Sequence, residues 1–109
     1  MADVIAREII RGENPDGTQV DVIIEIGAPH PYEQSQNEWV CASEVQGLSW
    51  RKHRIHGGSA LQALCLSLQS IRWALGQFRE DGGKLGYEIG RDDFDIDVVF
   101  GTGNLPTRS

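Results

Sequence analysis

The sequence contains little cysteine and no long apolar run. Its 109 residues include two cysteines, Cys41 and Cys65, and neither belongs to a pair spaced like metal ligands. No apolar run approaches the roughly 20 residues that span a bilayer, and residues Met1–Val4 do not resemble a signal peptide. We therefore expect a cytoplasmic protein with no membrane association, in which both cysteines are small buried residues.

Positive charge is also scarce. Ten Lys and Arg residues face 16 Asp and Glu residues, so the formal net charge is -6. A whole-molecule attraction to nucleic acid is excluded on this basis, and a basic or neutral partner is favoured. Hydrophobic residues at 39% and charged residues at 24% are ordinary for a globular protein. We expect one α+β domain over residues 1–100 and a flexible C-terminal tail over 101–109.

The first half of the chain has the pattern of β-strands. Residues 4–11 and 18–26 are rich in β-branched side chains and flank the turn sequence Asn14-Pro15-Asp16-Gly17, which predicts a hairpin. In the second strand, alternate residues form one wholly apolar face that we expect in the core: Val20, Val22, Ile24 and Ile26. Alternating apolar residues predict a third strand that starts at Trp39, and a weaker pattern predicts a fourth over Leu48–Ile55.

A single long helix follows. Ser59-Ala60-Leu61-Gln62 fits a capping box and Asp81-Gly82-Gly83 ends the periodicity, so we place the helix at about 59–80. Its large apolar residues form one stripe that we expect to lie across the sheet: Leu61, Leu64, Cys65, Leu68, Ile71, Leu75 and Phe78. A second stripe holds small residues that would allow another backbone, of this chain or of a second copy, to approach closely: Ala60, Ala63, Ser67, Ser70 and Ala74.

After the helix, Leu85–Ile89 and the alternating segment Phe94–Val98 predict one or two further strands. The fold class is therefore α+β. An antiparallel sheet of four to six strands packs on one long amphipathic helix, in the order of four strands, the helix and then one or two strands.

Basic residues and glycines converge just before the helix. Backbone N–H groups at a helix start, together with guanidinium groups, can bind a small anion such as phosphate or a carboxylate. The alternative is a charged edge strand that pairs with the protein's own carboxylates. The residues of this candidate anion site are Arg51, Arg54, His56, Gly57, Gly58 and Ser59.

No other chemistry is predicted. The spacing of His30, His53 and His56 matches no zinc signature, and the acidic residues 92–97 lack the glycine and distal glutamate of a calcium loop. Ser59 does not lie in a nucleophile elbow, because Ala60 and Leu61 follow it. We therefore expect no metal, no cofactor and no catalytic residue.

Two large apolar residues interrupt the polar face of the helix. Leu66 and Trp73 are seven residues apart and lie among glutamines, roughly opposite the apolar stripe. Such residues often mark a protein interface, and the alternative is that another segment of this chain covers them.

The sequence resembles a family of small bacterial proteins known only as a domain of unknown function. The resemblance covers about residues 6–80, and similar helices often carry Asp at the position of Ser59. It implies the fold but no activity, and the acidic segment after Gly90 has no counterpart in it. The motifs that carry it are Ala6–Ile9, Ile26-Gly27 with Pro29 and Pro31, Trp39 with Cys41, Gly47-Leu48, Gly57–Leu68, Ile71-Arg72 and Leu75.

These features favour a non-catalytic protein-binding or accessory domain, of the inhibitor or immunity type, that binds a protein partner or forms a homodimer. Leu66 and Trp73 are the predicted interface. The alternative is a module that binds a small anion at the helix start, and an enzyme at that same site is the third hypothesis.

Overall fold

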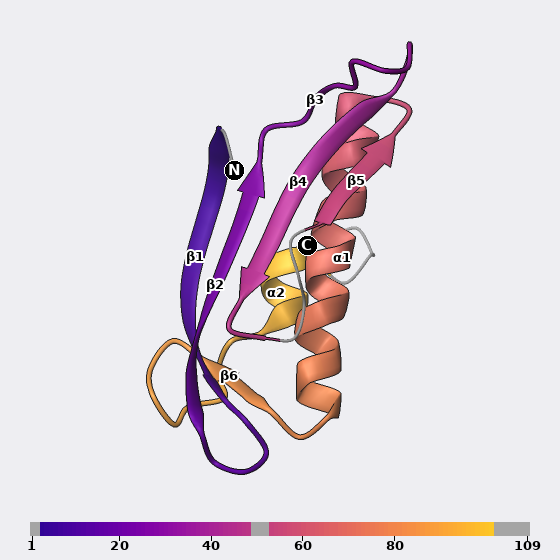
Figure 1. The fold of residues 1–109 in the computed structure, drawn as a ribbon. Coiled ribbons are helices and arrows are strands. Elements are labelled where there is room, and N and C mark those ends of the chain that lie inside the picture. Colours follow the sequence, from indigo (N-terminus) through magenta and orange to yellow (C-terminus); the bar gives the residue numbers. More distant parts are fainter. Residues whose placement is uncertain (1–2, 49–52, 102–109) are drawn as a thin grey trace, which may run out of the picture.

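The computed structural model describes residues 3–48 and 53–101, which form an antiparallel sheet with one long helix on a single face (Figure 1). The predicted α+β class is confirmed. Two predicted features lie partly outside the described residues: the tail, from residue 102 onward, and the fourth strand predicted over Leu48–Ile55, of which residues 49–52, including Arg51, are not described. The elements are β1 Val4–Glu13, β2 Gln19–Gly27, β3 His30–Pro31, β4 Trp39–Gln46, β5 His53–Gly57, α1 Ala60–Glu80, β6 Lys84–Gly86 and α2 Ile96–Phe100.

The order of the strands defines two edges of the sheet. The hydrogen-bonded order is β3-β4-β2-β1-β6, and β5 also pairs with β4. Ser43 of β4 pairs with Ile26 of β2 and with His53 of β5, so β5 lies on the side of β4 away from β2. One edge is therefore β5, and the other is β1 with the three-residue strand β6 beside it (Figure 1).

The predicted hairpin is confirmed. The Gly17 N–H donates to the Asn14 carbonyl at 2.8 Å, and Gly17 has a φ of +89°, which glycine adopts without strain. The Thr18 N–H donates to the Asp16 carboxylate at 2.9 Å. Hydrogen bonds from Thr18 hold the pKa of Asp16 below its ordinary value, because they stabilise the charged form.

Alternation along the strands places the predicted apolar face of β2 in the core. Val22 lies opposite Ile10 of β1, and Ile24 lies opposite Val45 of β4, so these side chains share the face that the helix covers. The core cluster comprises Ile10, Val22, Ile24, Ile26, Cys41, Val45, Ala63, Ile71, Leu75, Leu85, Phe94 and Ile96.

The helix begins where the capping box predicts. The Ser59 hydroxyl accepts a hydrogen bond from the Gln62 N–H at 3.1 Å, and the Gln62 side chain accepts one from the Gly58 N–H. Both bonds satisfy donors that a helix start otherwise leaves without partners.

The predicted packing face of the helix is partly wrong. Ile71 and Leu75 are buried as expected, but Leu61 is 70% exposed and Leu68 is 37% exposed. Cys65 is also exposed, contrary to prediction. The buried residues are Ala63, Ser67, Ile71, Ala74 and Leu75. The small-residue stripe therefore packs on the sheet of its own chain and turns several leucines outward.

Close contact with β4 and β5 explains this rotation. A Cβ added at Gly57 would lie 2.7 Å from the Ala63 nitrogen, so only glycine fits between the strand and the helix. The Ser67 hydroxyl donates to the Cys41 carbonyl at 3.2 Å. Small side chains let the backbone of α1 approach the backbones of β4 and β5. The helix is therefore rotated so that its small residues face these strands.

The segment after the helix also differs from prediction. Between residues 81 and 101, only Lys84–Gly86 forms a strand, and residues 96–100 form the short helix α2 where a strand was predicted. The Asp95 carboxylate accepts from the Val98 N–H at 3.1 Å and so caps this helix. Phe94 and Ile96 are buried, but Val98 is 78% exposed, so the alternation does not reflect a strand face.

We predict that Ile71→Ala lowers the free energy of unfolding by about 2 to 5 kcal/mol, because it leaves a cavity between α1 and the sheet. Leu61→Ala removes an exposed side chain and should change stability by about 0.5 kcal/mol or less. Urea unfolding followed by far-UV dichroism measures both. Equal losses in the two variants would contradict the packing described here.

A second prediction compares two buried hydroxyls. Ser43 Oγ has no hydrogen-bond partner among the described residues, whereas Ser67 Oγ donates to Cys41. Ser43→Ala should leave stability unchanged or raise it by about 1 kcal/mol, since it removes an unsatisfied polar group. Ser67→Ala should lower stability by about 1 kcal/mol. Thermal unfolding of both variants decides, and a loss in Ser43→Ala as large as that in Ser67→Ala would refute the prediction.

Candidate functional site

The predicted anion-site residues lie on two faces of the sheet. Gly57 of β5 contacts α1 through its close approach to Ala63, so it lies on the helix side. Side chains alternate along a strand, so the even-numbered residues Arg54 and His56 lie on the opposite face of β5 from Gly57. Both therefore lie on the face away from α1. The arginine and the histidine therefore share one face, and the helix start lies on the other.

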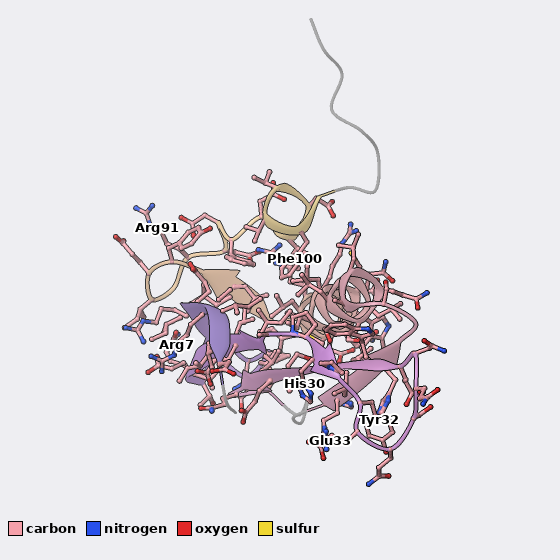
Figure 2. The ribbon with its side chains drawn as sticks, turned by 90° about the horizontal axis from the view of Figure 1, so that it is seen from above. Arg7, His30, Tyr32, Glu33, Arg91 and Phe100 are labelled. Carbon is pink, nitrogen blue, oxygen red and sulfur yellow. The ribbon has the colours of Figure 1, made fainter. Side chains whose placement is uncertain are left out.

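His56 and Gly58 already have partners within the chain. His56 Nδ1 lies 3.1 Å from a carboxylate oxygen of Glu38, and its ring meets the edge of Tyr32 at a centroid distance of 4.8 Å. Figure 2 labels Tyr32, which lies in the loop that follows β3. The Gly58 N–H donates to Gln62. The described members of the candidate anion site thus do not converge on one point.

The predicted partner residues, by contrast, lie together. Trp73 is 64% exposed and Leu66 is 37% exposed, and both line an open hollow of about 450 Å³ between α1 and β5. Ile55 and His53 of β5 form the strand side of the hollow. We call this region the Trp73 surface; its residues are His53, Ile55, Leu66, Gln69, Ser70 and Trp73.

One polar residue of the Trp73 surface already has a hydrogen-bond partner within α1. The Ser70 hydroxyl donates to the Leu66 carbonyl at 3.1 Å within the helix. Its hydrogen-bonding capacity is thus partly satisfied before any partner arrives. A partner that covers this surface would bury the exposed indole of Trp73 and the side chain of Leu66, which favours association.

A second hollow lies on the other side of α1 and was not predicted. It is an apolar groove of about 400 Å³. It lies between the helix-facing side of β1 and β2, the helix α1, and the segment from Tyr87 to Phe100. Leu68, which the sequence placed in the core, lines this groove. The leucines of the large apolar stripe were the signal that could have revealed it. The lining residues are Ala6, Arg7, Glu8, Ile24, Ile26, Leu68, Ile71, Tyr87, Phe94, Val99 and Phe100.

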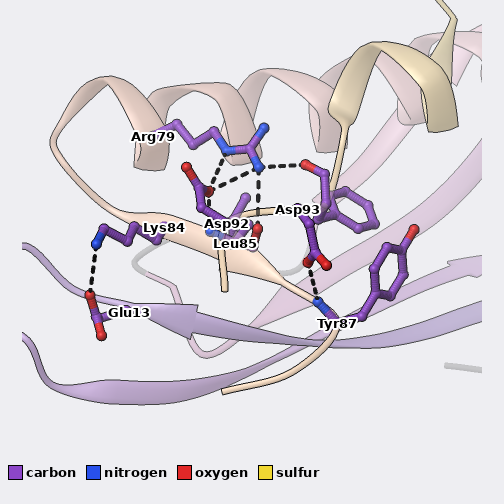
Figure 3. A network of polar contacts seen from close by, with 8 residues as sticks. Glu13, Arg79, Lys84, Leu85, Tyr87, Asp92 and Asp93 are labelled. Carbon is purple, nitrogen blue, oxygen red and sulfur yellow. Dashed lines mark hydrogen bonds and ion pairs between the residues drawn. The ribbon is translucent and has the colours of Figure 1, made fainter. Parts of the chain in front are cut away.

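An arginine at the end of α1 holds the C-terminal wall of this groove in place (Figure 3). The Arg79 Nε donates to the Asp92 carboxylate at 3.1 Å, and its Nη2 donates to the carbonyls of Leu85 and Phe94. The same Asp92 oxygen accepts from the Leu85 N–H at 2.9 Å. One carboxylate therefore joins α1, β6 and the segment that carries Phe94.

Neighbouring contacts reinforce this arrangement. The Lys84 ammonium lies 3.7 Å from Glu13 and fastens β6 to β1, and the Tyr87 N–H donates to Asp93 at 3.1 Å (Figure 3). A Cβ added at Gly86 would lie 2.3 Å from the Arg91 carbonyl oxygen, so the chain turns back closely here.

Among the described residues no group of three or more His, Cys, Asp or Glu side chains could hold a metal ion. The acidic residues Asp92 and Asp93 instead accept hydrogen bonds within the chain.

We predict that Asp92→Ala accelerates amide hydrogen exchange at Leu85 and Phe94 by about tenfold or more, because it removes the acceptor of the Leu85 N–H and frees Arg79. Glu80→Ala, which changes an exposed carboxylate at the same end of α1, is the control. Exchange rates are measured by NMR. Unchanged protection at both amides would show that Asp92 does not hold this segment.

Comparison with known proteins shows a family and no function. No curated protein and no solved structure matches the chain. No helix among the described residues is long and apolar enough to cross a membrane. The family match covers residues 10–98, so it extends beyond the range suggested by resemblance and includes the acidic segment after Gly90. The chain belongs to the family described as a domain of unknown function, DUF6968.

Proposed function

We propose that this domain binds another protein through the Trp73 surface. The observation that carries the proposal is the exposure of Trp73 on the long helix, beside Leu66 and an open hollow. Tryptophan buries a large area on association and is enriched among residues that dominate binding energy. An accessory, inhibitor or immunity-type role in the cytoplasm is consistent with this surface.

Charge supports a partner of neutral or basic character. The chain has a formal net charge of -6, which attracts basic surfaces over distances of about 10 Å at moderate ionic strength. A second copy of the chain has the same charge, and a homodimer would have to overcome that repulsion. We therefore favour a different protein as the partner.

The alternative of a small anion at the helix start has weaker support. Arg54 and His56 lie on the face away from α1, and the Gly58 N–H is bonded to Gln62. A phosphate there would have to displace Gln62 and would meet neither basic side chain. No observation on the described residues favours it over the Trp73 surface.

We predict that the double variant Leu66→Ser, Trp73→Ala weakens association by about 2 kcal/mol or more while the domain stays folded, since a central aromatic anchor carries a large share of binding energy. Affinity capture from the native cell with wild type, the double variant and a Leu61→Ser control identifies the partner that only the double variant loses. Sedimentation of the purified proteins tests a homodimer in parallel.

Far-UV dichroism separates the two ways in which the variant could fail. Leu61 is a suitable control because it is exposed on α1 outside the Trp73 surface. If the double variant unfolds, the face is part of the monomer's own packing and the proposal is wrong. If it stays folded and keeps every partner of the wild type, the Trp73 surface is not the interface.

A further inference from the structure

The strand β1 has a long open edge. It has ten residues, Val4–Glu13, and pairs with β2 along nearly its whole length on one side. On its other side β6 pairs only with Arg11, Gly12 and Glu13. The chain turns away at Gly86, so among the described residues no strand covers the edge of β1 from Val4 to Ile10 (Figure 1).

The hydrogen bonds of the hairpin show which backbone groups point to this edge. The Asn14 N–H donates to the Thr18 carbonyl at 2.8 Å, at the end of the β1–β2 ladder. Hydrogen-bonded pairs alternate in an antiparallel ladder. The next bonded pairs are therefore those of Gly12, Ile10 and Glu8, whose backbone groups point toward β2.

The residues between them direct their backbone groups outward. Arg11 does so and meets Gly86 of β6 there. Arg7 and Ile9 follow the same alternation, so their two N–H groups and two carbonyls lie along the open edge, where no strand of the described part of the chain pairs with them. Such a row of groups is a template for an added strand.

The apolar groove runs beside this edge. Ala6 and Glu8 lie opposite Ile26 and Ile24 of β2, so their side chains are on the helix side of the sheet and line the groove. Phe100 of α2 lies on the same side of the sheet, as Figure 2 shows. Alternate side chains of a strand added to β1 would enter the groove, because side chains of paired residues share a face.

Glu8 sets the charge preference of this site. It is exposed at the groove, and no ion pair with it is formed among the described residues, whereas the nearby Arg7 pairs with Glu25 at 3.4 Å. A carboxylate on an otherwise apolar face disfavours a neutral strand and a second acidic copy of this chain. It favours a basic side chain directly opposite.

We propose that the open edge of β1 binds an extended peptide segment of a partner protein as an added strand, in line with β6. The segment carries a Lys or Arg opposite Glu8 and an apolar side chain two residues away, opposite Ala6, where the groove receives it. This site is separate from the Trp73 surface and does not depend on that proposal.

A synthetic peptide tests the proposal directly. The probe is an acetylated, amidated peptide Thr-Lys-Thr-Phe-Thr-Val, which spans the open edge without reaching the part of β1 that β6 covers, added to the full chain and followed by ¹H–¹⁵N NMR. Antiparallel pairing places its lysine opposite Glu8 and its phenylalanine opposite Ala6. We expect shifts at the amides of Arg7 and Ile9 and at Leu68 and Phe100, and small shifts at Trp73.

Two methylated peptides provide a control that leaves the protein unchanged. N-methylation of the two threonines that flank the lysine removes the N–H groups that face Ile9 and Arg7, and should weaken binding by about tenfold or more. N-methylation of the lysine and the phenylalanine removes N–H groups that point away from β1 and should leave binding nearly unchanged. Equal effects of the two modifications would overturn the added-strand geometry.

A charge exchange tests the role of Glu8. Glu8→Lys should reverse the preference, so that a peptide with glutamate in place of lysine binds more tightly than the original. Glu33→Lys, an exposed control outside the groove, should retain the wild-type preference. An unchanged preference in Glu8→Lys would overturn the assignment of this residue. Sedimentation as a dimer that Ile9→Pro dissociates would show that a second copy occupies the edge instead, and would overturn the proposal.

Discussion

The architecture depends on how closely α1 approaches β4 and β5. Gly57 leaves no room for a side chain beside Ala63, and Ser67 bonds to the backbone of Cys41. Because these small residues are buried against the strands, the rotation of α1 about its axis is fixed. That rotation decides which residues of α1 are left at the surface, so it produces both the exposed Trp73 and the groove that Leu68 lines.

Local signals predicted the parts of the fold that local chemistry determines. The turn residues Asn14–Gly17, the alternation in β2 and the capping box at Ser59 each act within a few residues, and each was confirmed. For Leu66 and Trp73 the sequence left two alternatives open, an interface or a cover by another segment of the chain, and both residues are exposed in the structure.

The features that the sequence did not reveal depend on contacts between distant segments. The sequence pattern was interpreted by placing the large apolar residues of the helix in the core, which assigned Leu61 and Leu68 to it. In the structure, small residues of α1 pack beside β4 and β5 instead. The acidic alternation after Gly90 has the period of a strand. Its carboxylates instead bond to Arg79, which is 13 residues from Asp92 in sequence, and to backbone N–H groups of β6 and α2.

The single carboxylate of Asp92 has a consequence for the dynamics of the sheet. Because one oxygen joins the last turn of α1 to β6 and to the segment beyond it, these parts should open and close as one cooperative unit. When that unit opens, β6 leaves β1 and the full length of the strand is exposed. The length of edge offered to an incoming strand is therefore coupled to the local stability of the C-terminal segment, and a longer strand would compete with the chain's own β6 for the same backbone groups.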